Sequence, residues 1–167
     1  MNQRNATSLS SSLPSAAPAA LDESALRLDK QLCFALYSSS LAMTKLYKPL
    51  LAKLGLTYPQ YLVMLVLWEE DGVTVSALGE RLFLDSGTLT PLLKRIEAQG
   101  FLRRARSAED ERQVIVSLTQ AGRDLRTTAV QVPYAVACAS ACSLEQIQAL
   151  TTELHALRSN LIAGRSD

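Results

Sequence analysis

The sequence predicts a mainly α-helical domain that carries one small β-hairpin. Apolar residues recur at helical spacing in several segments, beginning with the stretch from Leu26 to about Lys53. Two short runs, FLRRAR and QVIVSL, are typical of strands and are separated by a charged connection. With 167 residues, 48% hydrophobic and 20% charged, the chain is long enough to bury one core.

The first two predicted helices follow one another closely. The first covers residues 26–53 and contains Pro49, which predicts a bend because proline lacks a backbone donor. Gly55 ends this helix, and Thr57 is the expected N-cap of a strongly apolar helix that stops near residues 71–72.

Two shorter helices are predicted before the hairpin. Thr74 caps the first, and the second begins at Asp85 or Ser86 and ends at Gly100. A start near residues 86–88 is expected to place Pro91 where its missing donor is tolerated.

Helical pattern returns after Thr119 and continues to the C-terminus. One helix is predicted to be interrupted near Pro133. The last helix is opened by Ser143 with Gln146 three residues on, which is the spacing of a capping box.

The N-terminal residues 1–25 are rich in Ser, Ala and Pro and lack the continuous apolar region of a secretory signal. We expect a disordered N-terminal tail here, followed by a single domain over residues 26–167. No apolar run approaches the ~18 residues of a membrane span. A cytoplasmic protein with reduced thiols and no membrane partner is therefore predicted.

A local basic patch is hidden by the net charge of +1. Six of the 17 Lys and Arg residues fall between Lys94 and Arg112. The plain alternative is a solvated hairpin in which Glu109, Asp110 and Glu111 balance the arginines. The order helix, turn, helix, charged hairpin favours a winged helix-turn-helix that binds double-stranded DNA.

The predicted DNA-contacting groups lie on the second helix of that motif and on the hairpin. Hydroxyls and free backbone N–H groups at a helix start contact phosphates and base edges, and cations contact phosphates. The candidates are Ser86, Thr88, Thr90, Lys94 and Arg95 on the helix, with Arg103, Arg104, Arg106 and Arg112 on the hairpin.

Three cysteines, Cys33, Cys138 and Cys142, are the remaining chemical groups of interest. An odd number without CxxC spacing argues against a disulfide framework. His155 is the only histidine, so a zinc site is not expected, and no cofactor or metal is predicted. Either the thiols are buried core groups or they have a redox role.

Tyrosines near Cys33 bear on that choice. Tyr37 lies four residues after Cys33 and shares its helix face. Tyr47 lies roughly 21 Å along a continuous helix at 1.5 Å per residue. It can therefore meet a Cys33 only if a second copy of the helix lies antiparallel beside the first. Such hydroxyls would supply the donors that a reactive thiolate requires.

The segment from Ser76 to Gly122 resembles the DNA-binding lobe of the MarR-type winged-helix regulators. The residues that carry the resemblance are Gly100 to Arg104, Asp110 to Arg112, and Val116 to Gly122. It implies a homodimer that places the second helix of the motif in the major groove. By the same resemblance, Arg112 enters the minor groove and is oriented by Asp110.

The resemblance covers residues 26–165 and divides them by role. It implies a DNA-binding lobe at about 57–118 and dimerisation helices at about 26–54 and 119–165. The apolar faces of the first and last helices also exceed what one small lobe can cover, which favours the same homodimer.

Within that family, LDKQLCFALYSSS and LYKPLLAKLGLTYPQY are similar to the organic-hydroperoxide-resistance repressors. This resemblance implies that Cys33 is the peroxide sensor and that Tyr37, Tyr47 and Tyr58 hydrogen-bond near its thiolate. It further implies that Cys138 forms an intersubunit disulfide with Cys33 and that DNA is released.

Two other functions stay open from the sequence. One is a regulator that responds to a small aromatic ligand and whose cysteines take no part in sensing. The other is a thiol peroxidase, which the absence of CxxC and of a strand-rich thioredoxin pattern disfavours. We therefore expect a repressor and not an enzyme.

Overall fold

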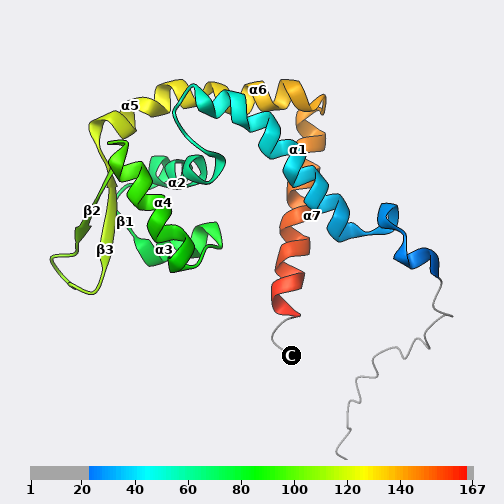
Figure 1. Cartoon of the computed structure of the whole chain (residues 1–167), viewed down its shortest axis with the longest axis horizontal. Coiled ribbons are helices and arrows are strands. Elements are labelled where there is room, and N and C mark those ends of the chain that lie inside the picture. The colour runs from blue at the N-terminus through cyan, green and yellow to red at the C-terminus, as the bar shows by residue number, and fades with distance from the viewer. Residues whose placement is uncertain (1–22, 165–167) are drawn as a thin grey trace, which may run out of the picture. The chain divides into compact units, whose positions relative to one another are not determined.

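The computed structural model describes residues 23–164 (Figure 1). It confirms a mainly helical chain with a small antiparallel sheet, and it divides into two compact units, residues 1–40 and residues 41–167. Of the predicted disordered tail, residues 1–25, residues 1–22 lie outside the described residues, and residues 23–25 form part of a 3₁₀ turn. The helices are α1 (Leu32–Ala52), α2 (Tyr58–Glu69), α3 (Val75–Leu82), α4 (Ser86–Ala98), α5 (Gln120–Ala129), α6 (Gln131–Ser140) and α7 (Leu144–Ala163), and the strands are β1 (Val73–Thr74), β2 (Leu102–Arg106) and β3 (Val114–Leu118).

The first unit begins with two 3₁₀ turns, η1 (Glu23–Leu26) and η2 (Leu28–Lys30). The α-helix starts at Leu32, so the prediction that it starts at Leu26 is wrong. Arg27 is extended (φ −67°, ψ 133°), and its guanidinium pairs with Asp29 at 3.0 Å. Residues two apart do not face each other on an α-helix, so this pair belongs to the turn conformation and not to a helix.

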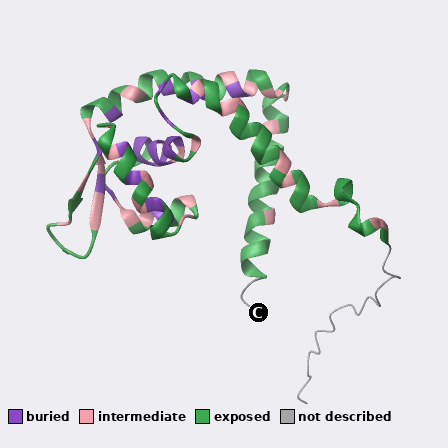
Figure 2. Cartoon of the chain, viewed as in Figure 1, coloured by how far each residue is buried: buried purple, intermediate pink, exposed green. Residues whose placement is uncertain are grey.

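Helix α2 lies at the centre of the second unit and is mostly buried (Figure 2). The predicted N-cap is confirmed, because the Thr57 backbone N–H donates to Gln60 Oε1 at 2.8 Å. Gly55 adopts φ +68°, a left-handed conformation that glycine accepts without strain. Leu51, Leu54 and Leu56 on either side of this turn are buried, which anchors the end of α1 on the core.

Helices α3 and α4 form the predicted helix-turn-helix. The Thr74 side chain accepts from the Ala77 N–H at 3.0 Å, and Asp85 accepts from the Thr88 N–H at 2.9 Å. Pro91 was expected near the start of α4, but it is the sixth residue of a helix that begins at Ser86. Its missing donor therefore costs one internal hydrogen bond, and its exposed position leaves the ring in solvent.

The sheet has the strand order β1–β3–β2, with both pairings antiparallel. The predicted hairpin of β2 and β3 is confirmed, and Arg104 stands opposite Val116. Strand β1 was not predicted, because two residues are too few to produce an alternating pattern.

The two helices after the sheet join at Val130, between the end of α5 and the start of α6. Pro133 is the third residue of α6, where a backbone N–H has no helical partner. Gly122 in α5 lies against the residue that precedes β2, since a Cβ built there would stand 1.9 Å from the Phe101 carbonyl oxygen. The Trp68 indole N–H donates to the Gly122 carbonyl at 2.8 Å and ties α5 to α2.

Helix α7 buries none of its residues, and large apolar side chains stay exposed on it. A surface of this kind marks a contact with another protein surface. No helix in the described part of the chain is both long enough and apolar enough to cross a bilayer. The exposed apolar residues of α6 and α7 include Tyr134, Leu144, Leu150, Leu154, Leu161 and Ile162.

Candidate nucleic-acid interface and thiol site

The first turn of α4 presents an ordered hydroxyl to solvent. Thr88 donates its backbone N–H to Asp85 Oδ1 at 2.9 Å and its hydroxyl to Asp85 Oδ2 at 2.8 Å. These two bonds, the backbone one first, hold the pKa of the Asp85 carboxyl below its ordinary value. With its hydrogen committed to Asp85, the exposed Thr88 hydroxyl offers only lone pairs to a ligand.

The other predicted groups of α4 follow its outer face. Ser86, Lys94 and Arg95 are exposed, whereas Thr90 is half-buried. Leu89, Leu93 and Ile96 are buried and set the opposite, core-facing side. The amphipathic pattern of α4 therefore leaves hydroxyls at its start and cations further along free for a partner.

The tip of the hairpin is shaped by Asp110. Its carboxylate accepts from the Arg112 backbone N–H at 3.0 Å and from the Gln113 amide at 3.2 Å. The resemblance predicted that Asp110 orients Arg112, and the contact found is with the Arg112 backbone. Among the described residues, no ion pair involves the exposed Arg112 guanidinium, which leaves it available for a partner.

Arg104 differs from the other predicted arginines because its guanidinium already has a partner. It forms an ion pair with Glu97 of α4 at 2.6 Å. Its predicted DNA contact therefore competes with an intramolecular bond. Glu97 was not singled out from the sequence, because its partner lies on a separate element of the fold.

A cleft of about 290 Å³ lies between the helix-turn-helix and the hairpin. It brings Thr90, Arg104 and Arg112 together from the predicted set. Ser86, Thr88, Lys94 and Arg95 do not line it. The complete lining is Thr74, Val75, Ser76, Thr90, Leu93, Arg104, Arg112, Gln113 and Val114.

All three cysteines are free thiols. Cys33 is exposed near the start of α1, and Tyr37, one turn further along, is 62% exposed. Cys138 is exposed near the end of α6. Cys142 is half-buried after the left-handed Ala141, and its thiol donates to the Ser140 carbonyl at 3.4 Å.

An aromatic cluster joins the end of α1 to α2. The ring centroids of Tyr47 and Tyr58 are 4.8 Å apart, and those of Tyr47 and Tyr61 are 6.1 Å apart. Burial raises the pKa of Tyr47, and Tyr58 raises it further. Burial also raises the pKa of Tyr61. These two phenols thus keep their protons at neutral pH and can donate them in hydrogen bonds.

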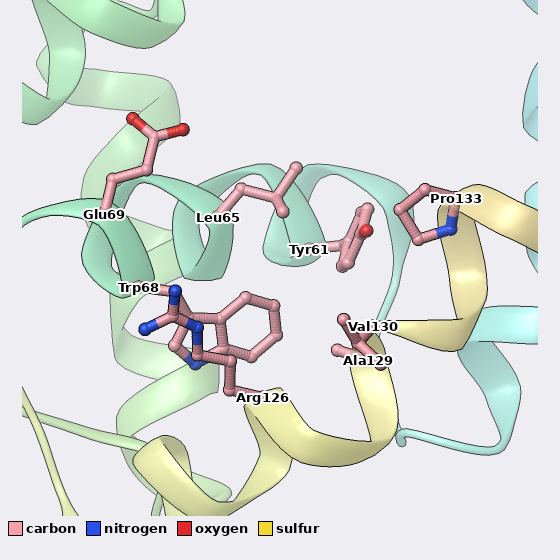
Figure 3. A pocket seen from close by; sticks show the side chains of 8 residues that line it. All are labelled: Tyr61, Leu65, Trp68, Glu69, Arg126, Ala129, Val130 and Pro133. Carbon is pink, nitrogen blue, oxygen red and sulfur yellow. The ribbon is translucent and has the colours of Figure 1, made fainter. Parts of the chain in front are cut away.

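Tyr61 was missed from the sequence, although its spacing from Tyr58 places both on one face of α2. It continues the cluster towards Trp68, whose ring centroid is 6.2 Å away. Both residues line a pocket of about 190 Å³ between α2 and the α5–α6 region (Figure 3). Arg126 from α5 and Pro133 from α6 complete its mainly apolar wall.

Comparisons with known proteins place the chain in a family. The family model described as transcriptional regulator SarA/Rot matches residues 45–128. The organic hydroperoxide resistance transcriptional regulator of Bacillus subtilis is 52% identical over 136 residues, which cover 81% of this chain and 92% of that protein. The chain belongs to the MarR/SarA family of winged-helix transcriptional regulators.

Solved structures of another regulator of this family, AbfR, match over most of the chain. Reduced AbfR bound to DNA has a TM-score of 0.70 and 36% identity, and the match covers 84% of this chain and 98% of that one. The disulfide form of AbfR has a TM-score of 0.59 at 36% identity, covering 84% and 96% of the two chains. The expected family and the winged-helix fold are thereby confirmed.

Proposed function

We propose that this MarR/SarA-family regulator is a homodimeric repressor that binds operator DNA and releases it when an organic hydroperoxide oxidises Cys33. The observation that carries the proposal is the exposure of the free Cys33 thiol. On a single chain this thiol is accessible, as reaction with a peroxide and pairing with a cysteine of a second chain both require. The name of the Bacillus subtilis relative supports an organic hydroperoxide as the oxidant.

The DNA-binding surface consists of the outer face of α4 and the tip of the hairpin. Ser86, Thr88, Thr90, Lys94 and Arg95 act in the major groove, and Arg112 acts in the adjacent minor groove. The exposure of Ser86, Thr88, Lys94 and Arg95 on α4 and the free Arg112 guanidinium support this assignment. Reduced AbfR is bound to DNA in its structure, which supports DNA binding as such.

The dimer is formed by helices α1, α6 and α7. The exposed apolar side chains of α7 support this role, because a monomer would leave them in water. A second copy is also required if Tyr47 is to assist Cys33, since fourteen residues of helix separate the two along one chain.

Oxidation proceeds in two balanced steps. The Cys33 thiolate attacks the terminal peroxide oxygen, the O–O bond breaks, and the alcohol leaves while the sulfur becomes a sulfenic acid. The partner subunit's Cys138 then attacks that sulfur, an S–S bond forms, and the hydroxyl leaves as water. The existence of a disulfide form of AbfR supports the second step.

A regulator that responds to a small aromatic ligand is the main competing function. The mainly apolar pocket beside Tyr61 would be the natural site for such a ligand (Figure 3). Its volume of about 190 Å³ is below the ~300 Å³ at which ligand pockets usually begin. This pocket is therefore small for such a ligand, which weighs against it as a site of ligand control.

The proposal is tested by DNA release. Duplexes selected by the reduced protein from a random library serve as the operator. One equivalent of cumene hydroperoxide should lower affinity for them by about 5- to 150-fold, the usual range of allosteric coupling. Dithiothreitol should restore the affinity. An affinity that does not change with peroxide would reject redox control, and continued consumption of excess peroxide would indicate a peroxidase.

Replacing Tyr47 with phenylalanine is expected to slow the oxidation of Cys33 about tenfold while DNA binding by the reduced protein is retained. The change removes one hydrogen bond to a charged sulfur, worth about 1.5–3 kcal/mol, with little change in volume. Labelling of remaining thiols after timed exposure to cumene hydroperoxide measures the rate. The wild type is the reference. An oxidation rate of Tyr47→Phe equal to that of the wild type would remove Tyr47 from the sensor.

A further inference from the structure

Glu97 and Arg104 join the recognition helix α4 to the hairpin. The Arg104 backbone N–H donates to Glu97 Oε1 at 2.8 Å. Its side-chain Nε and Nη2 donate to Glu97 Oε2 at 3.0 and 2.6 Å. Arg104 of β2 thus donates to both carboxylate oxygens of Glu97. Bonds to both oxygens fix the relative orientation of the two residues as well as the distance between them.

The pair is partly shielded from solvent. The side chains of Arg104 and Glu97 are only 23% and 34% exposed, less than those of the other ion pairs in the described part of the chain. The Arg104 side chain, followed by its backbone N–H, holds the pKa of Glu97 below its ordinary value. The carboxylate therefore stays charged at neutral pH, and the pair persists there.

The position of the pair suggests what it controls. Thr90, Leu93 and Glu97 follow one another at spacings of three and four residues on α4, so they share a face. The first two line the cleft between α4 and the hairpin, and Arg104 and Arg112 line it as well. The Glu97–Arg104 pair holds β2 beside α4, and Arg112 lies in the hairpin that continues from β2. The distance between α4 and the Arg112 backbone therefore depends on this pair.

We propose that Glu97 and Arg104 are positioning residues that set the reach of Arg112 relative to α4, and that Arg104 is not itself a DNA contact. The inference rests on the proposed DNA-binding function. A helix in the major groove and an arginine in the next minor groove must fit one duplex at the same time. Holding β2 against α4 before DNA arrives removes the cost of ordering the hairpin on binding.

The two roles for Arg104 predict opposite effects of a change at Glu97. If Arg104 contacts a phosphate, Glu97→Gln frees its guanidinium and tightens DNA binding. If the pair positions the hairpin, the same change weakens binding about five- to tenfold, since the negative charge is lost and the glutamine side chain has only one acceptor oxygen for the Arg104 donors. Glu80→Gln is the matched control, because it removes an exposed carboxylate of α3 that forms no ion pair among the described residues and lies outside the proposed DNA-binding surface.

The experiment measures the dissociation constant for the selected duplexes at several salt concentrations. Glu97→Gln and Arg104→Gln should weaken binding equally, and their combination should be no weaker than either alone. The salt dependence should stay that of the wild type, whereas a lost phosphate contact would reduce its slope by about one unit per site. Tighter binding by Glu97→Gln, or a reduced slope for Arg104→Gln, would overturn the proposal.

A double-mutant cycle with Arg112→Ala separates positioning from general stability. Once Arg112 is absent, Glu97→Gln should have no further effect on DNA affinity. Additive losses would show that the pair does not act through Arg112 and would reject the inference. If the wild type itself selects no DNA sequence, the proposed function fails, and that outcome is distinct from all of these.

Discussion

Replacing Cys33 with serine is expected to leave the protein bound to its operator at peroxide concentrations that fully release the wild type. Serine matches the thiol in size but does not react with peroxides, so neither the sulfenic acid nor the disulfide can form. Because Cys33 is exposed on α1, the substitution should leave the fold intact. Cumene hydroperoxide should therefore leave the DNA affinity of Cys33→Ser unchanged, whereas the wild type should lose the about 5- to 150-fold that is usual for allosteric coupling.

The other two cysteines provide the controls for this prediction. Non-reducing electrophoresis after mild oxidation should show a covalent dimer for the wild type and for Cys142→Ser. Neither Cys33→Ser nor Cys138→Ser should form it, because each lacks one of the two sulfurs. A monomer with an internal disulfide would contradict the intersubunit step. If Cys33→Ser releases DNA as readily as the wild type, Cys33 is not the sensor.

Replacing Arg112 with alanine is expected to weaken operator binding about 100-fold. A well-placed arginine contributes about 1.4 kcal/mol, a factor of ten, and a dimer has two hairpins. Because two cations are lost from the interface, the slope of the logarithm of affinity against that of salt should fall by roughly 1.8. The Asp110 carboxylate accepts from the backbone of residue 112, so alanine retains the turn.

Lys53→Ala is the matched control for Arg112→Ala. It removes one exposed positive charge from the turn after α1, outside the proposed DNA surface. Its affinity and salt slope should remain close to those of the wild type. Equal losses in both variants would mean that Arg112 acts only through overall charge, and wild-type affinity for Arg112→Ala would remove it from the interface.

Local signals in the sequence were sufficient for most of the secondary structure. Thr57, Thr74 and Ser143 were predicted as helix caps and are found as N-caps. Asp85, one of the two residues predicted to open α4, is its N-cap. Caps and turn glycines act on their nearest neighbours, so residue identity alone identifies them. The start of α1 was misplaced because apolar periodicity continues into a segment where Arg27 and Asp29 stabilise a turn.

The sequence by itself determined the family, the winged-helix fold and the candidate set of hydroxyls, arginines, tyrosines and thiols. Only the tertiary structure decided which of these groups are free to act. Arg104 and Arg112 are equivalent in a charge pattern, yet one is paired with Glu97 and the other has no ion-pair partner among the described residues. Tyr61 likewise joins Tyr47 through contacts between helices. The physical reason is that ion pairs and ring contacts depend on distances of a few ångströms between separate elements, which residue order does not encode locally.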